Sequence, residues 1–334
     1  MSEIVLEGVS KRFGGVAAVD GVSFRAEKGK FVVLLGPSGC GKATLLRMIA
    51  GLEDDSAGKV FIEGRDVTAL DPTKRRLSMV FQSYALFPHL SVAENIVFGL
   101  KVRRLPAAQR EERLKRVAGL VGLSERLHHK PQELSGGQRQ RVALARAIVS
   151  ENPICLMDEP LSNLDAQLRQ EMRAEIRALQ RRLDITVVYV THDQVEAMSM
   201  ADQVILLRAG KIEQAGTPAE LYARPASTFA ARFIGTPAMN LVPLEAVQPG
   251  AGGGRTMGIR PEHIQLVSNG GGVAAVVQSA EYHGADTIVT ARVGEAALLV
   301  RAPGEVTLAQ GSQVRLGWEP GAVHLFDAEK GLRI

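Results

Sequence analysis

The residues best suited to chemistry form a glycine-rich loop that ends in a lysine, within the stretch VVLLGPSGCGKATLLRMIAGL. Gly36, Gly39 and Gly41 let the backbone curl so that successive amides face a phosphate. Lys42 adds a positive charge near the β- and γ-phosphates. The pattern G-x-x-x-x-G-K-[ST] calls next for a hydroxyl that binds magnesium, but the residue there is Ala43. The loop therefore predicts a nucleotide site in which one metal ligand is missing.

Two acidic residues follow an apolar, strand-sized run later in the chain, in NPICLMDEP. At the end of a strand, Asp158 can hold magnesium directly or through water, and Glu159 can polarise an attacking water. Two surface acids after a core strand would be common by themselves, but these follow a glycine loop in the same chain. The pair therefore favours hydrolysis of a nucleotide phosphate.

Alternating strand-like and helix-like segments position these groups over residues 1–235, as in α/β folds. GKFVVLLG is a buried strand before the loop, and TLLRMIAGL is a helix that ends on Gly51. NPICLMDEP and ITVVYVTHD are further apolar strands with polar residues at their carboxyl ends. Ligands bind at those ends in open parallel sheets, so we expect the polar residues to meet there. In LDAQLRQEMRAEIRALQRRL, an apolar stripe from Leu164 to Leu183 predicts a helix packed on the core.

The composition changes near residue 236, where TPAMNLVPL and the glycine-rich QPGAGGGR begin a segment with little helical period. Its short strands alternate, as in QVRLGW, where Val314, Leu316 and Trp318 share a face. Residues 236–334 are therefore predicted to form a separate small β domain, either a barrel or a sandwich.

The composition excludes several classes of protein. A chain of 334 residues that is 46% hydrophobic and 23% charged is typical of an ordinary soluble protein with two domains. No apolar run approaches the ~20 residues of a membrane helix, and the N-terminus lacks a signal-peptide layout, so we expect the cytosol. A net charge of +4 without a basic, aromatic-rich face does not predict nucleic-acid binding. Cys40 and Cys155 are expected to be reduced thiols.

A third motif, LSGGQRQRVALARAI, opens a helix with Ser135 and two glycines, whose first amides are free to bind an anion. With LSGGQ ahead of MDEP and SNLDA, the chain resembles the nucleotide-binding subunit of ABC transporters, and this signature excludes small GTPases and kinases. The resemblance implies an α/β P-loop NTPase: an ABC cassette with a RecA-like core and a helical subdomain at about residues 88–150. A small all-β regulatory domain of OB or barrel type would follow. It also implies ATP and Mg²⁺, and a homodimer in which the signature of one subunit caps the ATP on the loop of the other.

The functional residues of the family carry over position by position. Gln82 in VFQSYALFPHLSVAEN looks like the glutamine that touches magnesium and the attacking water. His192 in VYVTHDQVEAM resembles the switch histidine at the γ-phosphate. Phe13 in SKRFGG resembles the aromatic that stacks on adenine, and a core phenylalanine is the alternative. Asp165 in SNLDA sits where the family makes contact across the dimer. The implied catalytic residues are Glu159, His192 and Gln82, and the implied magnesium ligands are Gln82 and Asp158. The implied ATP-binding residues are Phe13, Gly36, Pro37, Ser38, Gly39, Cys40, Gly41, Lys42, Ala43, Thr44, Ser135, Gly136, Gly137, Gln138 and Asp165.

The segment YALFPHLSVAEN has the form found in importers. The resemblance implies that two membrane-spanning permease subunits dock near Tyr84–Pro88, although these apolar residues could instead form a lid over the helical subdomain. A periplasmic or extracellular solute-binding protein would be an indirect partner, and nucleic acid would not be one. GTPAELYARPASTFAARFIGTPAMN and MGIRPEHIQL resemble maltose- and glycerol-3-phosphate-type ATPases, and EYHGADTIVTARVGEAALLVR and VHLFDAEKGLRI favour the latter. The protein would lie on the cytoplasmic face of the inner membrane as a peripheral subunit.

The leading interpretation is thus an ATPase that drives import of sn-glycerol-3-phosphate or a related sugar or polyol. ATP binding would close a head-to-tail dimer, and hydrolysis would reopen it. One alternative is a regulatory ABC subunit that binds nucleotide but hydrolyses it poorly because of Ala43. Another is an ABC protein acting on ribosomes or DNA, which usually needs two cassettes or a long coiled insertion. We expect Ala43 to keep phosphate binding, weaken the Mg²⁺ dependence and slow turnover, because Thr44 is rotated ~100° away along the helix.

Overall fold

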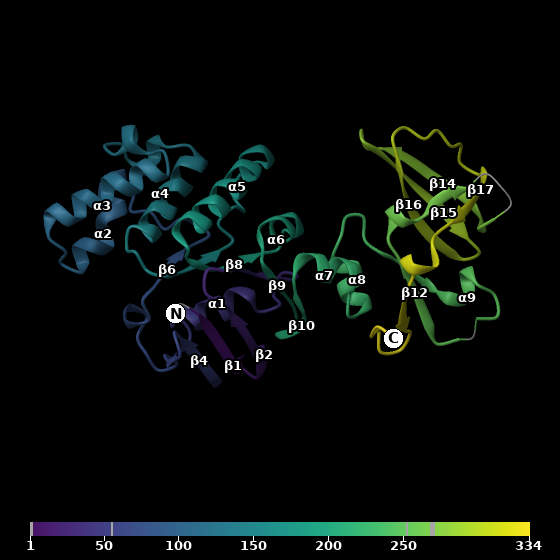
Figure 1. Cartoon of the computed structure of the whole chain (residues 1–334), viewed down its shortest axis with the longest axis horizontal. Helices are drawn as coiled ribbons and strands as arrows, with labels where there is room; N and C mark the ends of the chain where they lie inside the picture. The colour runs from purple at the N-terminus through teal and green to yellow at the C-terminus, as the bar shows by residue number, and fades with distance from the viewer. Residues whose placement is uncertain (1–2, 55, 252, 268–270) are drawn as a thin grey trace. The chain divides into compact units, whose positions relative to one another are not determined.

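The computed structural model describes residues 3–54, 56–251, 253–267 and 271–334. It divides into two compact units, Met1–Pro218 and Ala219–Ile334 (Figure 1). This division falls before residues 235 and 236, where the composition changes. The physical reason is that the segment with helices α7 (Pro218–Ala223) and α8 (Thr228–Phe233) is bonded to the β-rich unit by a buried arginine.

The first unit is built on a six-stranded sheet of order β10-β9-β3-β8-β7-β6. Its strands pair in parallel except β10, which runs antiparallel to β9. Every residue of β3, β7 and β8 is buried, as expected for parallel strands covered on both faces. The strands are β3 (Phe31–Leu35), β6 (Leu77–Val80), β7 (Ile154–Asp158), β8 (Thr186–Thr191), β9 (Gln203–Arg208) and β10 (Lys211–Gly216).

A second, antiparallel sheet of order β2-β1-β4-β5 shares an apolar core with the central sheet and helix α1 (Lys42–Ala50). Leu45, Leu46 and Ile49 of α1 are fully buried in this core. The helix ends at Gly51 as predicted, and this glycine has the left-handed conformation of a helix C-cap. The strands are β1 (Ile4–Phe13), β2 (Val16–Ala26), β4 (Ala57–Ile62) and β5 (Arg65–Asp66).

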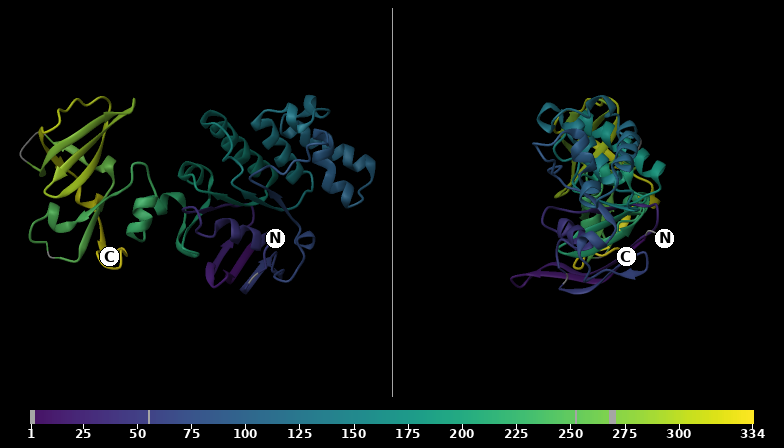
Figure 2. Two further views of the ribbon diagram at one scale, coloured as in Figure 1. Left: turned by 180° about the vertical axis from the view of Figure 1, so that it is seen from behind. Right: turned by 90° about the vertical axis from the view of Figure 1, so that its left-hand side faces the viewer.

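Three helices, α2 (Val92–Val102), α3 (Ala107–Leu120) and α4 (Gly136–Ile148), pack on one another and form a bundle, as Figures 1 and 2 show. Helices α5 (Ala166–Leu183) and α6 (Gln194–Met200) complete the unit, with 3₁₀ turns at Pro72–Lys74, Ser124–Arg126 and Pro131–Glu133. The predicted stripe of α5 is buried at its centre, at Met172, Ile176 and Leu179. None of the helices in the described part of the chain is both long and apolar enough to cross a bilayer.

The second unit contains two antiparallel sheets, β11-β12-β18 and β13-β17-β14-β15-β16. One apolar cluster draws on both sheets, and Val314 and Trp318 pack against it near the buried Leu316. The unit is thus the small β domain that the alternation predicts. Its elements are β11 (Asn240–Pro243), α9 (Leu244–Val247), β12 (Arg255–Ile259), β13 (Gln265–Val267), β14 (Val273–Tyr282), β15 (Asp286–Val293), β16 (Ala296–Pro303), β17 (Gln313–Gly317) and β18 (His324–Asp327), with 3₁₀ turns at Pro261–His263 and Pro320–Ala322.

Arg260 is the buried arginine that bonds the α7–α8 segment to these sheets. It is 1% exposed, and its guanidinium lies 4.1 Å from the centre of the Tyr222 ring. The guanidinium donates hydrogen bonds to the carbonyl oxygens of Tyr222, Ala231 and Ile234. Burial lowers the pKa of Arg260. One side chain therefore bonds three carbonyls, one in α7, one in α8 and one in the C-cap residue of α8.

We expect Arg260→Ala to lower the free energy of unfolding by about 3 kcal/mol, because three buried carbonyls lose their donor. Urea denaturation measures this change. Arg255→Ala is the matched control, since Arg255 is exposed on β12, and it should change stability by less than ~0.5 kcal/mol. Equal losses in the two variants would contradict the role of Arg260.

Candidate active site

The carboxyl ends of four neighbouring strands bring the predicted site together. β3 leads into the loop at Gly36, β8 ends just before His192, β7 ends at Asp158, and β6 ends shortly before Gln82. These strands are consecutive and parallel in the sheet, in the order β3-β8-β7-β6. Their carboxyl ends therefore open on one edge, so the loop and the catalytic candidates lie at a single site.

The glycine loop adopts backbone angles that other residues rarely take. Gly36, Gly39 and Gly41 have φ angles of 153°, 77° and 101°. A Cβ atom on Gly36 would lie 2.4 Å from the carbonyl oxygen of Leu207, and one on Gly41 would lie 2.2 Å from that of Ala18. A Cβ on Gly39 would meet nothing within 4 Å. Glycine is thus required at two positions by close backbone contact, while the third borders open space where a ligand fits.

Lys42 lies folded against the loop that precedes it. It is 5% exposed, and its Nζ donates to the carbonyl oxygens of Gly36 and Pro37 at 2.8 and 2.9 Å. Helix α1 begins at Lys42 after a glycine that provides no side-chain cap, so its first amides are available to an anion. Burial raises the pKa of the Cys40 thiol, although the charge of Lys42 opposes this. The donors present fit the phosphates of a nucleotide.

The other loop residues flank this cradle. Ser38 is exposed beside Gly39, and Ala43 and Thr44 are half-buried in the first turn of α1. Both cysteines are free thiols, and burial raises the pKa of Cys155 to about 12.

Asp158 and Glu159 differ in environment although they are adjacent. Asp158 is 6% exposed, and burial raises its pKa while Arg47, whose Nη2 lies 3.9 Å from Oδ2, lowers it. Glu159 has a φ of 42°, which is a strained value for a residue with a side chain, and its amide donates to the Val190 carbonyl at 3.1 Å. Oε2 of Glu159 lies 3.3 Å from Nδ1 of His192. The acid suited to polarising water therefore contacts the predicted switch histidine.

Gln82 is exposed and bonded to the segment after β7. Its Nε2 lies 3.4 Å from the Ser162 hydroxyl, and its main-chain carbonyl accepts from Asn163 Nδ2 at 3.1 Å. The same hydroxyl donates to the Glu159 carbonyl at 3.0 Å. Ser162 and Asn163 are therefore site residues that the sequence analysis did not single out, although the SNLDA motif that contains them was the available signal.

A magnesium site made by the protein together with substrate phosphates fits these residues. The candidate ligands are the side chains of Gln82 and Asp158, and Ala43 offers no side-chain oxygen. Among the described residues, no group of three or more His, Cys, Asp or Glu is arranged to hold a metal. Mg²⁺ commonly takes one or two protein ligands and completes its shell with phosphate oxygens and waters, so this donor set suits it.

The signature residues build the start of α4. The Ser135 hydroxyl accepts from the Gln138 amide at 3.3 Å, and Gln138 Oε1 accepts from the Ser135 amide at 3.0 Å. This reciprocal pair is a capping box. No hydrogen bond or ion pair among the described residues joins Ser135–Gln138 to the glycine loop of the same chain.

The two signature glycines also have a packing role. A Cβ on Gly136 would lie 3.2 Å from the Leu164 side chain, and one on Gly137 would lie 3.0 Å from that of Leu168. Asp165 caps α5 by accepting the Leu168 amide at 2.9 Å. The start of α4 therefore packs closely on the start of α5, so two of the predicted contact motifs support each other.

Phe13 ends β1 and is 49% exposed as a residue, so it is not a core phenylalanine. Lys11 Nζ lies 5.0 Å from the centre of the Phe13 ring. An aromatic residue with this exposure and a cation beside it suits stacking on a base.

The importer-like segment Tyr84–Pro88 is partly buried. Tyr84 is 8% exposed, so its side chain belongs to a lid over the helices rather than to a free surface. Leu86 and Phe87 are half-buried, and Pro88 is exposed. The rings of Phe87 and Phe98 lie 4.4 Å apart, and Phe98 is itself 37% exposed. The burial of Tyr84 fits the lid interpretation, and docking of a permease at the more exposed residues of the segment stays a prediction.

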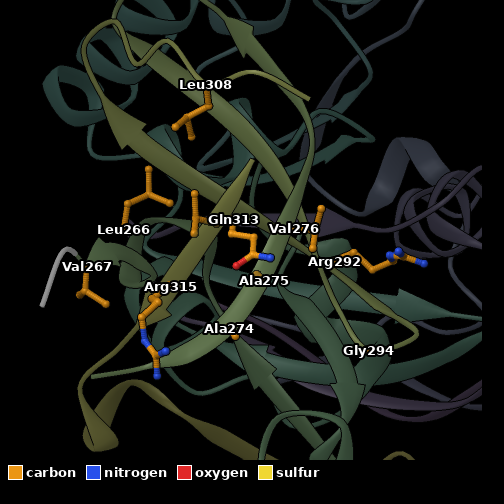
Figure 3. A pocket seen from close by; sticks show the side chains of 11 residues that line it. Leu266, Val267, Ala274, Ala275, Val276, Arg292, Gly294, Leu308, Gln313 and Arg315 are labelled. Carbon is orange, nitrogen blue, oxygen red and sulfur yellow. The ribbon is translucent and has the colours of Figure 1, made fainter. Parts of the chain in front are cut away.

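A hollow of about 750 Å³ lies in the second unit, and none of its lining residues is a predicted site residue. Figure 3 shows that Arg292 and Arg315, its two cations, point away from each other. Arg315 also donates to the carbonyls of Gly271 and Gly272, at 2.8 and 2.9 Å. The two guanidinium groups therefore do not form one anion site.

Comparisons with known proteins agree with this geometry. The family model for ABC transporters matches residues 19–162, and that for the TOBE domain matches residues 257–326. The sn-glycerol-3-phosphate import ATP-binding protein UgpC of Cereibacter sphaeroides is 46% identical over the full length of both chains. The chain belongs to the ABC transporter ATP-binding proteins. UgpC of Brucella abortus biovar 1 is 49% identical over 98% of both chains.

A solved structure supports the assignment of this ABC cassette. It is a dimeric ATP-binding cassette in a post-hydrolysis state, bound to ADP and Pi. Its TM-score is 0.58 at 32% identity, and the match covers 64% of this chain and 98% of that one. The predicted fold, an ABC cassette followed by a small β domain, is confirmed, and the β domain is a TOBE domain.

Proposed function

We propose that this ABC protein is the ATP-hydrolysing subunit of an importer for sn-glycerol-3-phosphate or a related sugar or polyol. The observation that carries the proposal is the likeness over the whole chain to proteins named as sn-glycerol-3-phosphate import ATP-binding proteins. These include UgpC of Yersinia pseudotuberculosis serotype I, which is 46% identical over 100% of this chain. The likeness extends over the TOBE domain as well as the cassette.

In the proposed reaction, the loop amides and Lys42 bind the ATP phosphates. Glu159 takes a proton from the attacking water, and His192, 3.3 Å from it, orients this carboxylate beside the γ-phosphate. Gln82 and Asp158 would hold Mg²⁺, which supplies positive charge to the phosphate oxygens when bound. Gln82 also orients the water, since Ser162 and Asn163 fix its position.

A second copy of the chain completes the proposed site. Ser135–Gln138 would cap the ATP of the partner in a head-to-tail dimer, and Asp165 would lie at the contact. The dimeric state of the solved cassette supports this arrangement. ATP binds the closed dimer more tightly than the open one, so binding closes it and hydrolysis reopens it. Two permease subunits would dock near Tyr84–Pro88 at the cytoplasmic face of the membrane, below a solute-binding protein.

Uptake of radiolabelled sn-glycerol-3-phosphate tests this assignment. Cells that lack the chain should lose saturable uptake and regain it with the wild-type protein but not with Glu159→Gln. Undiminished uptake in the deletion strain would refute sn-glycerol-3-phosphate as the substrate. Loss of uptake of a different solute would identify that solute as the substrate instead.

The alternative function is a nucleotide-binding regulatory subunit with impaired hydrolysis, and Ala43 is the observation that favours it. Restoring the hydroxyl with Ala43→Ser should raise Mg²⁺ affinity and kcat by about tenfold, the scale on which one group near a metal acts. Nucleotide affinity without Mg²⁺ should stay the same, because the amide of residue 43 is unchanged. Steady-state ATPase assays with titrated Mg²⁺ measure both quantities. An Ala43→Ser variant with wild-type Mg²⁺ affinity and rate would refute this account of Ala43.

A further inference from the structure

The segment that follows Gln82 is held by two polar side chains from different helices, the buried Asn95 and the half-buried Arg146. Asn95 of α2 is fully buried, and its Oδ1 accepts from the Phe87 amide at 2.8 Å. Its Nδ2 donates to the carbonyl oxygens of Phe87, Leu90 and Ser91 at 3.1, 3.1 and 3.0 Å. The part of the segment from Phe87 to Ser91 is thereby fixed to α2.

Arg146 of α4 holds the part of the segment closer to Gln82, at Tyr84 and Ala85. Nη1 donates to the Ala85 carbonyl at 2.6 Å, and Nη2 donates to the Tyr84 carbonyl at 2.7 Å. Tyr84 and Ala85 have φ angles of 61° and 46°. Two successive left-handed residues with side chains are unfavourable by themselves, so the surrounding structure must hold them. The forked guanidinium bonds both of their carbonyls at once.

Arg146 has no other evident task. Burial lowers its pKa, and no carboxylate in the described part of the chain lies within ion-pair distance of it. A half-buried cation without a counter-ion loses part of its hydration, and its bonds to these two carbonyls compensate for that loss. Lysine could not replace it, because an ammonium lacks the planar fork that reaches two acceptors.

The clamped residues lie directly beside Gln82. The Tyr84 amide donates to the Phe81 carbonyl at 2.9 Å, which closes a turn with Gln82 inside it. Ser162 and Asn163 hold Gln82 from the other side. The position of Gln82 therefore depends on the turn that Arg146 stabilises.

We propose that Arg146 is a positioning residue for ATP hydrolysis, which holds the turn at Tyr84 and Ala85 so that Gln82 reaches the attacking water. The inference rests on the proposed ATPase function. Helix α4 begins with the signature at Ser135 and carries Arg146 near its other end. Gln82 and the signature are thus attached to one rigid helix, and movement of α4 moves both.

Arg146→Lys should lower kcat of the full-length chain by about tenfold, as misplacement of a catalytic group does. KM for ATP should change by less than about twofold, because the phosphate loop is untouched. The matched control is Arg141→Lys on the same helix, where the side chain bonds Glu175 at 2.8 Å instead. This control should keep wild-type kcat. A loss of kcat as large in Arg141→Lys as in Arg146→Lys would overturn the proposal.

A rescue experiment separates positioning from a general effect on folding. Glycine adopts left-handed angles readily, so Ala85→Gly lessens the need for the clamp. The loss caused by Arg146→Lys should shrink from about tenfold in the Ala85 background to about threefold in the Ala85→Gly background. Equal losses in both backgrounds would overturn the inference. An inactive wild-type chain would refute the proposed ATPase function instead, whereas an active wild type with a fully active Arg146→Lys variant refutes only the role of Arg146.

Discussion

Glu159→Gln is expected to lower kcat for ATP hydrolysis by about 10²–10⁴-fold, because an amide cannot accept the proton of the attacking water. The substitution keeps the size of the side chain and the backbone angle of 42°. It also keeps an oxygen beside His192 Nδ1, which lies 3.3 Å from Oε2 of Glu159. ATP binding should therefore persist. Phosphate release measures the rate, and titration with a fluorescent ATP analogue measures binding.

The matched control for this substitution is Glu171→Gln. Glu171 is exposed on α5, and its Oε1 lies 3.4 Å from Gln167 Nε2 on the same helix. It should retain wild-type kcat. A Glu159→Gln variant that hydrolyses ATP at more than about a tenth of the wild-type rate would require another base for the reaction.

Lys42→Met is expected to weaken ATP binding by roughly 30-fold or more, which corresponds to ~2 kcal/mol for a lost charge-assisted hydrogen bond. Methionine keeps the apolar stem of this buried side chain, so the loop should remain folded. The lost interactions are those of Nζ, which bonds the Gly36 and Pro37 carbonyls at 2.8 and 2.9 Å and is available to a phosphate.

Equilibrium titration with and without Mg²⁺ tests this prediction. Lys59→Met provides the control, because Lys59 is exposed on β4 and its nearest acid is Asp66 at 3.7 Å. This control should bind ATP like the wild type. Unchanged affinity in Lys42→Met would mean that the backbone amides alone hold the phosphates.

The meeting of the catalytic candidates could be predicted from the sequence, for a simple physical reason. Apolar runs before the glycine loop, Asp158 and His192 indicate parallel strands, and the carboxyl ends of such strands share one edge. The apolar stripe of α5 could also be predicted, because a helical period of 3.6 residues places its apolar residues on one face.

The contacts that hold these groups in place could not be predicted in the same way. Arg146 bonds Ala85 across 61 residues of chain, and Asn163 bonds Gln82 across 81. Such contacts depend on how α4 and the turn after β7 pack, and no local pattern encodes that packing. For the same reason, the second unit begins at Ala219 rather than at residue 236, where the composition changes. The contacts of Arg260 join α7 and α8 to the second unit, and the composition does not reveal such contacts.

The packing role of Gly136 and Gly137 could not be predicted from the sequence, for a different reason. Their pattern matches a nucleotide-contact motif, and the same absence of a side chain also lets α4 approach Leu164 and Leu168. A glycine pattern by itself does not distinguish close backbone contact with a ligand from close contact with a neighbouring helix.

A working ATPase site despite Ala43 is best tested by steady-state phosphate release from the purified full-length chain as Mg²⁺ is titrated. We expect release that saturates with ATP, requires Mg²⁺ and falls to background in Glu159→Gln. Nucleotide binding by a wild-type chain that releases phosphate no faster than Glu159→Gln at any Mg²⁺ concentration would contradict this expectation.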